Sequence, residues 1–201
     1  MSIKKIGVLG GSFNPIHKGH TALATAAKAE YRLDDVLLIP DKIPPHKSPD
    51  GLVSEEHRLN MCLIAAKNAG LSVSDIEHRL SGASYTYRTL GILKEMYNES
   101  ELWLICGTDM FNTLLSWKEP EKIFGLCTVC GLYRQGEDYE KMLKMQEKYL
   151  KIGAKAHIFK ADLPCISSTM IRNKLKSGDS VDGLLDSDVY SYIVKNNLYK
   201  D

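Results

Sequence analysis

Residues that could bind phosphate gather at two places in the chain, and the first begins at Gly10-Gly11. Two histidines, His17 and His20, follow that glycine pair at a spacing of three. The stretch has neither the glycine, lysine and hydroxyl order of a Walker A loop nor the GxGxxG dinucleotide fingerprint. Glycines let backbone approach a ligand closely, and a helix starting near Gly19 would offer unpaired N–H groups. Two imidazoles beside such a helix start favour phosphate binding.

The histidine pair taken alone has two other interpretations, zinc ligation and simple capping or packing at a helix start. Zinc is disfavoured because no third Cys, Asp or Glu ligand is close in sequence. Cys127 and Cys130 do not supply it, since they lie in an apolar segment that reads as a strand and do not share a face there. We predict core packing for both cysteines and no metal site built from protein ligands. The structural role of the histidines stays open on the residues alone.

The second place is Ile166-Ser-Ser-Thr-Met-Ile-Arg172, which precedes a predicted helix. Ser167, Ser168 or Thr169 can cap the helix, and Arg172, about one turn in, can reach phosphate oxygens by a forked contact. A capping Ser-Ser-Thr is by itself a common helix start. Paired with the first stretch across a parallel sheet, it adds a second helix N-terminus and a guanidinium. Together the two stretches predict a nucleoside triphosphate site.

The elements that must position these residues alternate between strands and helices. Strands are predicted at 3–9, 36–40, 71–75, 102–106, 124–133 and 155–159. Helices are predicted from His20 to Tyr31, from Ser54 to about 65, and at 86–97, 139–150, 168–177 and 186–196. Continuous apolar runs suit strands covered on both faces. The pattern predicts an α/β fold with a doubly wound, mostly parallel sheet that binds ligands outside the carboxyl ends of its strands.

Domain organisation looks simple, because no linker, internal repeat or low-complexity segment divides the sequence. We expect residues 1–201 to form a single domain with a small helical portion at about 168–201. The proline-rich segment 41–53 is predicted to be a surface loop.

Composition and charge limit the class of partner. The 201 residues include 26 Lys+Arg and 25 Asp+Glu, a formal net charge of +1, so no nucleic-acid partner is expected. No run approaches the roughly 20 apolar residues that span a bilayer, and the N-terminal apolar run is too short for a signal peptide. Five cysteines, an odd number, fit reduced thiols. We therefore expect a cytoplasmic protein with a small-molecule ligand and no membrane partner.

The two phosphate stretches together resemble the nucleotidyltransferase superfamily, whose Rossmann-like members carry HxGH and SxTxIR signatures. Three further stretches resemble the bacterial nicotinate-nucleotide adenylyltransferases: Ile39 to Lys47, Ser84 to Leu90, and Ile105 to Asp109 followed by Leu114 to Trp117. The similarity runs nearly end to end. Asn14 stands where many bacterial members have Asp, a departure that leaves the implied activity standing.

The resemblance implies transfer of an adenylyl group from ATP to nicotinate mononucleotide in NAD biosynthesis, with pyrophosphate leaving. Catalytic roles would fall to His17, His20 and Arg172. Residues that would contact ATP are Gly10, Gly11, Ser12, Phe13, Gly107, Ser168 and Thr169. Residues that would bind the acceptor are Lys47, Tyr85, Thr86, Asp109, Trp117 and Arg134. Mg²⁺ would be held mainly by ATP phosphate oxygens, since it keeps several waters and needs few protein carboxylates.

Two other functions stay open. The first keeps the superfamily and changes the acceptor to nicotinamide mononucleotide or phosphopantetheine. The second is a non-catalytic nucleotide-binding protein, which the intact phosphate motifs at both ends disfavour. A class I aminoacyl-tRNA synthetase shares the histidine signature, but this chain has no room for a tRNA-binding domain and no basic face. The sequence leaves a homo-oligomer open.

Overall fold

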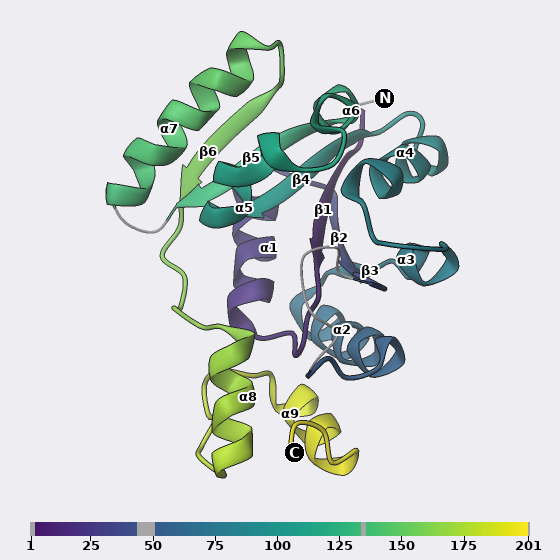
Figure 1. The fold of residues 1–201 in the computed structure, drawn as a ribbon, viewed down its shortest axis with the longest axis vertical. Coiled ribbons are helices and arrows are strands. Elements are labelled where there is room, and N and C mark those ends of the chain that lie inside the picture. Colours follow the sequence, from purple (N-terminus) through teal and green to yellow (C-terminus); the bar gives the residue numbers. More distant parts are fainter. Residues whose placement is uncertain (1–2, 44–50, 134–135, 201) are drawn as a thin grey trace. The chain divides into compact units, whose positions relative to one another are not determined.

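The computed structural model describes residues 3–43, 51–133 and 136–200. One parallel sheet has the strand order β3-β2-β1-β4-β5-β6, which places β1 and β4 at its centre (Figure 1). The strands are β1 (Lys5–Gly11), β2 (Asp35–Pro40), β3 (Ser72–Val73), β4 (Glu101–Gly107), β5 (Cys127–Tyr133) and β6 (Ala156–Lys160). The predicted α/β fold is confirmed.

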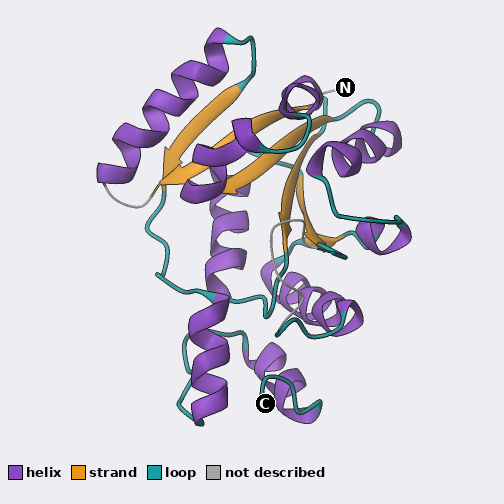
Figure 2. Cartoon of the chain, in the orientation of Figure 1, coloured by secondary structure: helices purple, strands orange, loops and turns teal. Residues whose placement is uncertain are grey.

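Helices join the strands along the chain (Figure 2). They are α1 (Lys18–Glu30), α2 (Glu55–Ala69), α3 (Ile76–Arg79), α4 (Thr86–Met96), α5 (Thr108–Thr113), the 3₁₀ helix η1 (Leu114–Ser116), α6 (Pro120–Leu126), α7 (Gly136–Lys151), α8 (Ser168–Ser177) and α9 (Ser187–Lys195). The described residues contain no helix of the length and apolarity that a bilayer crossing requires.

The predicted strand 124–133 is wrong at its start, because Phe124 to Leu126 belong to helix α6. This apolar stretch resembles a strand in sequence. Pro120 instead occupies the first turn of a helix, where its missing N–H is not needed, and Glu119 before it has a φ of 54°. The short helices α3 and α5 were not predicted, since neither is long enough to show a helical period.

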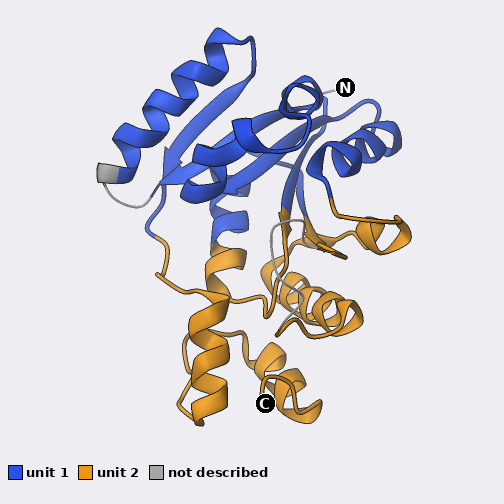
Figure 3. Ribbon diagram, in the orientation of Figure 1, with its two compact units in different colours: residues 1–9, 23–37, 85–162 blue, residues 10–22, 38–84, 163–201 orange. Residues whose placement is uncertain are grey.

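The chain divides into two compact units, each built from three segments (Figure 3). Unit 1 comprises residues 1–9, 23–37 and 85–162, and unit 2 comprises residues 10–22, 38–84 and 163–201. Strands β1 and β2 and helix α1 each begin in one unit and end in the other.

Unit 1 is built around β4, β5 and β6, against which α5, α6 and α7 pack. Gly131 of β5 shows how close this packing is, because a Cβ there would lie 2.4 Å from the Phe111 ring and 2.5 Å from Met142 Cε. Cys127 and Cys130 are buried and unpaired, as predicted. Burial raises the pKa of Cys127 to about 12, so its thiol stays protonated at neutral pH.

Unit 2 holds α2, α8 and α9 together with the carboxyl-terminal ends of β1 and β2. Helix α2 packs against α9 and β3. The hydroxyl of Tyr192 in α9 lies 3.0 Å from His57 Nδ1 and accepts a hydrogen bond from Asn60 Nδ2 at 3.1 Å. Ser54 caps α2 by accepting the N–H of His57, as the sequence predicted.

Candidate active site

The two histidines of the first stretch lie face to face in unit 2. Their ring centroids are 3.7 Å apart, with 22° between the ring planes. The backbone N–H of His17 donates to Nδ1 of His20 at 3.3 Å. Because that nitrogen accepts, the proton of a neutral His20 is assigned to Nε2. His20 is therefore held in the tautomer that offers an Nε2–H donor.

Neighbouring residues leave these rings little freedom. Gly19 lies close against the His17 ring, because a Cβ would lie 3.0 Å from both Cε1 and Nδ1 of His17. Phe13 is 1% exposed and meets the His20 ring edge to face at 5.0 Å. Phe13 also has a φ of 44°, a sparsely populated conformation for a bulky residue. Backbone held in this way is common at ligand sites.

Helix α8 meets the first stretch directly. Ser167 caps α8 by accepting the N–H of Met170, and the next residue, Ser168, donates its hydroxyl to the carbonyl oxygen of Pro15 at 2.9 Å. Arg172, one turn further on, donates from Nη1 to the carbonyl oxygen of Asn14 at 2.8 Å. The two phosphate stretches, which are about 150 residues apart in sequence, are thus joined side by side.

The side chain of Asn14 links three other parts of unit 2. Its Nδ2 donates to the carbonyl oxygen of Gly51 at 2.8 Å. Its Oδ1 accepts from the backbone N–H of Val53 at 3.3 Å and from the hydroxyl of Tyr199 at 2.8 Å. The amide is needed for this set, because an aspartate could not donate to Gly51.

The local charge at the two helix starts suits an anion. Helices α1 and α8 have no acidic residue in the first turn, whereas α2 has Glu55 and Glu56 there. No carboxylate of the first turn therefore offsets the positive end of the helix dipole at α1 or α8. Arg172 adds a guanidinium, whose Nη2 donates to Thr169 Oγ1 at 3.2 Å. Further N–H donors of this group remain for a ligand.

The remaining ATP-contact candidates are divided between the units. Gly10 and Gly11 end β1, and Ser12 follows them as a buried residue in unit 2. Gly107 ends β4 in unit 1 and takes the N-cap position of α5. Asp109 is the second residue of α5 and is exposed, so it is not the cap of that helix.

Three acceptor candidates of unit 1 lie at the ends of short elements. Thr86 is the first residue of α4, and Tyr85 before it stacks on Tyr87 with ring centroids 6.1 Å apart. Trp117 follows η1 and is half-buried. Within the described part of the chain, the side chains of these three residues make no hydrogen bond.

Two acceptor candidates, Lys47 and Arg134, lie outside the described residues. Within the ranges that are described, no cluster of His, Cys, Asp and Glu could hold a metal ion. A divalent cation at this site would be bound chiefly by the phosphate oxygens of the bound nucleotide.

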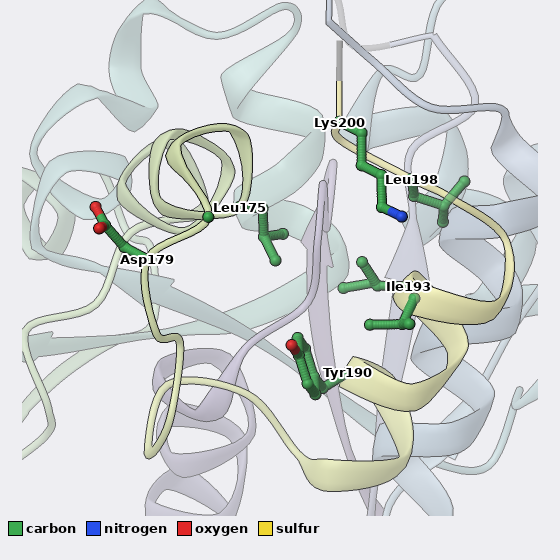
Figure 4. Close-up of a pocket in the computed structure, with 8 residues that line it drawn as sticks. Leu175, Asp179, Tyr190, Ile193, Leu198 and Lys200 are labelled. Atoms are coloured by element: carbon green, nitrogen blue, oxygen red, sulfur yellow. The ribbon is translucent and has the colours of Figure 1, made fainter.

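A separate cavity of about 120 Å³ lies at the far end of α8 (Figure 4). Apolar side chains of Leu175, Ile193 and Leu198 line it, with Asp179 and Lys200 as charged members. None of the residues selected from the sequence lines this cavity, so it is not the phosphate site.

Sequence reasoning missed two residues of unit 2 that contact the phosphate stretch, Arg58 and Tyr199. Arg58 is 2% exposed and donates to the carbonyl oxygen of Ser12. Burial raises the pKa of the Tyr199 phenol, which keeps it a proton donor to Asn14. Arg58 could have been noticed because it stands three and four residues before the apolar Met61 and Cys62, on the same face of a helix, but Tyr199 offered no comparable signal.

Known proteins resemble the chain over its whole length. A model of the cytidylyltransferase-like family matches residues 8–174. The chain is 39% identical to a probable nicotinate-nucleotide adenylyltransferase of Carboxydothermus hydrogenoformans, with 100% of both chains covered. It is 35% identical to another from Lachnoclostridium phytofermentans, covering 98% of this chain and 100% of the relative.

A solved structure agrees with the fold. The Plasmodium falciparum nicotinic acid mononucleotide adenylyltransferase complexed with NaAD aligns with a TM-score of 0.77 at 24% identity, over 98% of this chain and 97% of that one. The chain therefore belongs to the cytidylyltransferase-like family of nucleotidyltransferases. Its full-length relatives place it, within that family, among the nicotinate-nucleotide adenylyltransferases.

Proposed function

We propose that the protein transfers the adenylyl group of ATP to the 5′-phosphate of nicotinate mononucleotide and releases pyrophosphate. A phosphate oxygen of the acceptor forms a bond to the α-phosphorus of ATP, and the bond from that phosphorus to the bridging oxygen breaks. The product is nicotinate adenine dinucleotide. No protein nucleophile is required, because the acceptor phosphate is itself the nucleophile.

The observation that carries this proposal is the junction of the two phosphate stretches. Ser168 and Arg172 of α8 hydrogen-bond to the backbone of Pro15 and Asn14, immediately before the histidines. Two acid-free helix starts, two stacked imidazoles and a guanidinium thus lie in one unit. This combination suits a triphosphate whose negative charge shifts toward the leaving pyrophosphate during transfer.

Within this mechanism His20 donates its Nε2–H to the α-phosphate of ATP. The backbone N–H of His17 donates to Nδ1 of His20 and so fixes the His20 tautomer. Arg172 stabilises the leaving pyrophosphate with the donors that Asn14 and Thr169 do not use. Gly10, Gly11, Ser12 and Phe13 form the backbone that lies against ATP, together with the amides at Ser168 and Thr169 and with Gly107 of unit 1.

ATP enters as its magnesium complex, in which Mg²⁺ neutralises phosphate charge. The acceptor is held by the hydroxyl of Thr86 and nearby amides at its carboxylate, with Tyr85 or Trp117 against the pyridine ring. Asp109 serves the substrate hydroxyls or the waters around the ion. Lys47 and Arg134 are proposed for the acceptor phosphate on sequence alone.

The test is a comparison of acceptors. Pyrophosphate release would be measured with MgATP and, in parallel, nicotinate mononucleotide, nicotinamide mononucleotide or phosphopantetheine. We expect the highest kcat/KM with nicotinate mononucleotide. Preference for phosphopantetheine would overturn the roles of Thr86 and Trp117. Absence of release with both pyridine mononucleotides would favour the non-catalytic alternative.

A further inference from the structure

Among the described residues of unit 2, Arg58 is the most deeply buried cation, and no step of the proposed transfer uses it. It lies in the first turn of α2 and is 2% exposed. Burial lowers the pKa of its guanidinium, and the nearby carboxylate of Asp41 opposes that shift. Burying a cation is costly unless its donors are paired. A guanidinium at such a position therefore needs an explanation.

The guanidinium pairs with backbone carbonyl oxygens from three separate segments. Nη1 donates to Ser12 at 2.9 Å and to Asp41 at 2.6 Å, Nη2 donates to Lys42 at 3.1 Å, and Nε donates to Val53 at 3.3 Å. Four of the five N–H donors are thereby used. Lysine could not reproduce this pattern, because the bonds leave one rigid planar group in several directions.

Two of these four carbonyls lie where ligands commonly bind in a parallel sheet. Ser12 follows β1 and Asp41 follows β2, so both lie just beyond the carboxyl ends of neighbouring strands. The backbone N–H of Asp41 also donates to Gly11 at 3.0 Å. Lys42 and Val53 belong to the two ends of the 41–53 segment. One side chain thus holds both ends of that segment and the turn that leads to the histidines.

We propose that Arg58 is a positioning residue for adenylyl transfer, which sets the glycine turn at Ser12 and the ends of the 41–53 segment in one arrangement. The proposal rests on the proposed function. Reacting groups misplaced by about 1 Å lose roughly 100-fold in rate. Loss of the guanidinium should therefore act on turnover, although Arg58 itself touches no substrate.

The test is chemical rescue of Arg58→Ala in the full chain. We expect its kcat/KM for pyrophosphate release to fall by about 100-fold, on the scale of a misplaced reacting group. Guanidinium chloride at about 20 mM, far below denaturing concentrations, should restore part of the rate by occupying the vacated space. Urea, which is planar but uncharged, should not. Arg58→Ala with unchanged kcat and KM, or a folded Arg58→Ala protein that guanidinium does not rescue, would overturn the proposal.

Arg79→Ala is the matched control. Arg79 also lies in unit 2, but its side chain is 74% exposed and pairs with Asp75 at 2.8 Å. We expect normal kcat in this variant and no response to guanidinium. A rescue of the same size in Arg79→Ala would mean that guanidinium acts elsewhere, and the positioning role would be rejected.

Arg58→Lys keeps the test valid if the alanine variant does not fold. We expect this variant to fold and to keep a lowered kcat that guanidinium cannot restore, because the lysine side chain fills the space. A folded Arg58→Lys with wild-type kcat would overturn the proposal. Failure of both variants to fold would reduce Arg58 to a stability determinant and also overturn it.

A readout that needs no activity separates this proposal from the proposed function. Trypsin should cut Arg58→Ala within residues 41–53 faster than wild type, and guanidinium should slow the cut, with mass spectrometry locating the site. Equal cleavage rates in folded Arg58→Ala and wild type would count against the positioning role of Arg58. Wild-type protein that releases no pyrophosphate would contradict the proposed function, while the proteolysis result would still decide whether Arg58 holds the segment.

Discussion

The two units hold their candidate residues in different ways. In unit 2 the side chains of Ser168 and Arg172 donate to the backbone carbonyls of Pro15 and Asn14, and the His17 and His20 rings are stacked. Among the described residues of unit 1, the side chains of Tyr85, Thr86, Asp109 and Trp117 make no hydrogen bond. The protein groups that bind phosphate are therefore positioned before a ligand arrives. The side chains that bind the acceptor keep their hydrogen-bonding capacity for that ligand.

This difference has a kinetic meaning. Preset dipoles stabilise charge that develops in the transition state without further reorganisation. Groups that pair only with the bound acceptor contribute mainly to binding. Changes at the phosphate-binding residues of unit 2 should therefore lower kcat, and changes at Thr86 or Trp117 should chiefly raise the KM of the acceptor.

The largest effect is expected for His17→Ala. Loss of one preset group that stabilises transition-state charge lowers kcat by about 10²- to 10³-fold in other enzymes. His17 also holds the His20 ring by stacking, so we expect the upper part of that range. Initial rates of pyrophosphate release, with circular dichroism to verify the fold, measure it.

His157→Ala provides the control for that variant. His157 lies in unit 1 on β6, is exposed, and stacks on Trp103 rather than on either catalytic candidate. Its kcat should stay within about twofold of wild type, as expected for a surface change. Near-normal turnover in His17→Ala would remove the catalytic role of that residue and erase the contrast between the units.

A smaller loss is expected for Gly19→Ala. The added Cβ would lie 3.0 Å from the His17 ring, so the ring must move by a few tenths of an ångström. We expect kcat to fall by about 10- to 100-fold, in line with the effect of small misplacements on reactive groups. Gly91→Ala in α4 is the control, since a Cβ there meets nothing within 4 Å and alanine favours the helix. Equal rates in the two variants would show that the ring position is not critical.

The sequence predicts the long elements well because their apolar runs follow the period of the structure. Helix α8 matches its predicted bounds, Ser168–Ser177, since a capping serine and Gly178 delimit it. The start of β5 could not be found in this way. Apolar residues at the end of α6 continue directly into the strand, so no change of composition marks the boundary.

The site shows a similar limit. The residues that bind phosphate could be chosen from the sequence, because glycine, histidine and capping hydroxyls suit an anion wherever they lie. The role of Arg58 could not be predicted from the sequence, because every residue has a backbone carbonyl. The partners of Arg58 are the carbonyls of Ser12, Asp41, Lys42 and Val53. Only the fold reveals that these four groups meet.

Asn14→Asp tests the hydrogen bonds of unit 2 through stability. The new carboxylate would face the carbonyl oxygen of Gly51, which now accepts Nδ2 at 2.8 Å. We expect the free energy of unfolding to fall by about 1 to 3 kcal/mol, the usual effect of an unpaired buried polar group. Urea denaturation measures it. Asn60→Asp should change stability much less, because its partner, the Tyr192 hydroxyl, can turn and donate. Equal stability losses would contradict the special role of the Asn14 amide.

The smallest effect is expected for Thr86→Val, which keeps the shape of the side chain and removes its hydroxyl. If Thr86 donates to the acceptor carboxylate, the loss of about 1 kcal/mol corresponds to a rise of roughly fivefold in the acceptor KM. The KM of ATP and kcat should stay near wild type, because an interaction equal in ground and transition states affects KM alone. Thr113→Val, which removes a hydroxyl bonded at 2.9 Å to the Asp109 carbonyl oxygen, should leave the acceptor KM unchanged. A drop in kcat for Thr86→Val without a change in KM would mean that Thr86, like the groups of unit 2, is preset for the transition state.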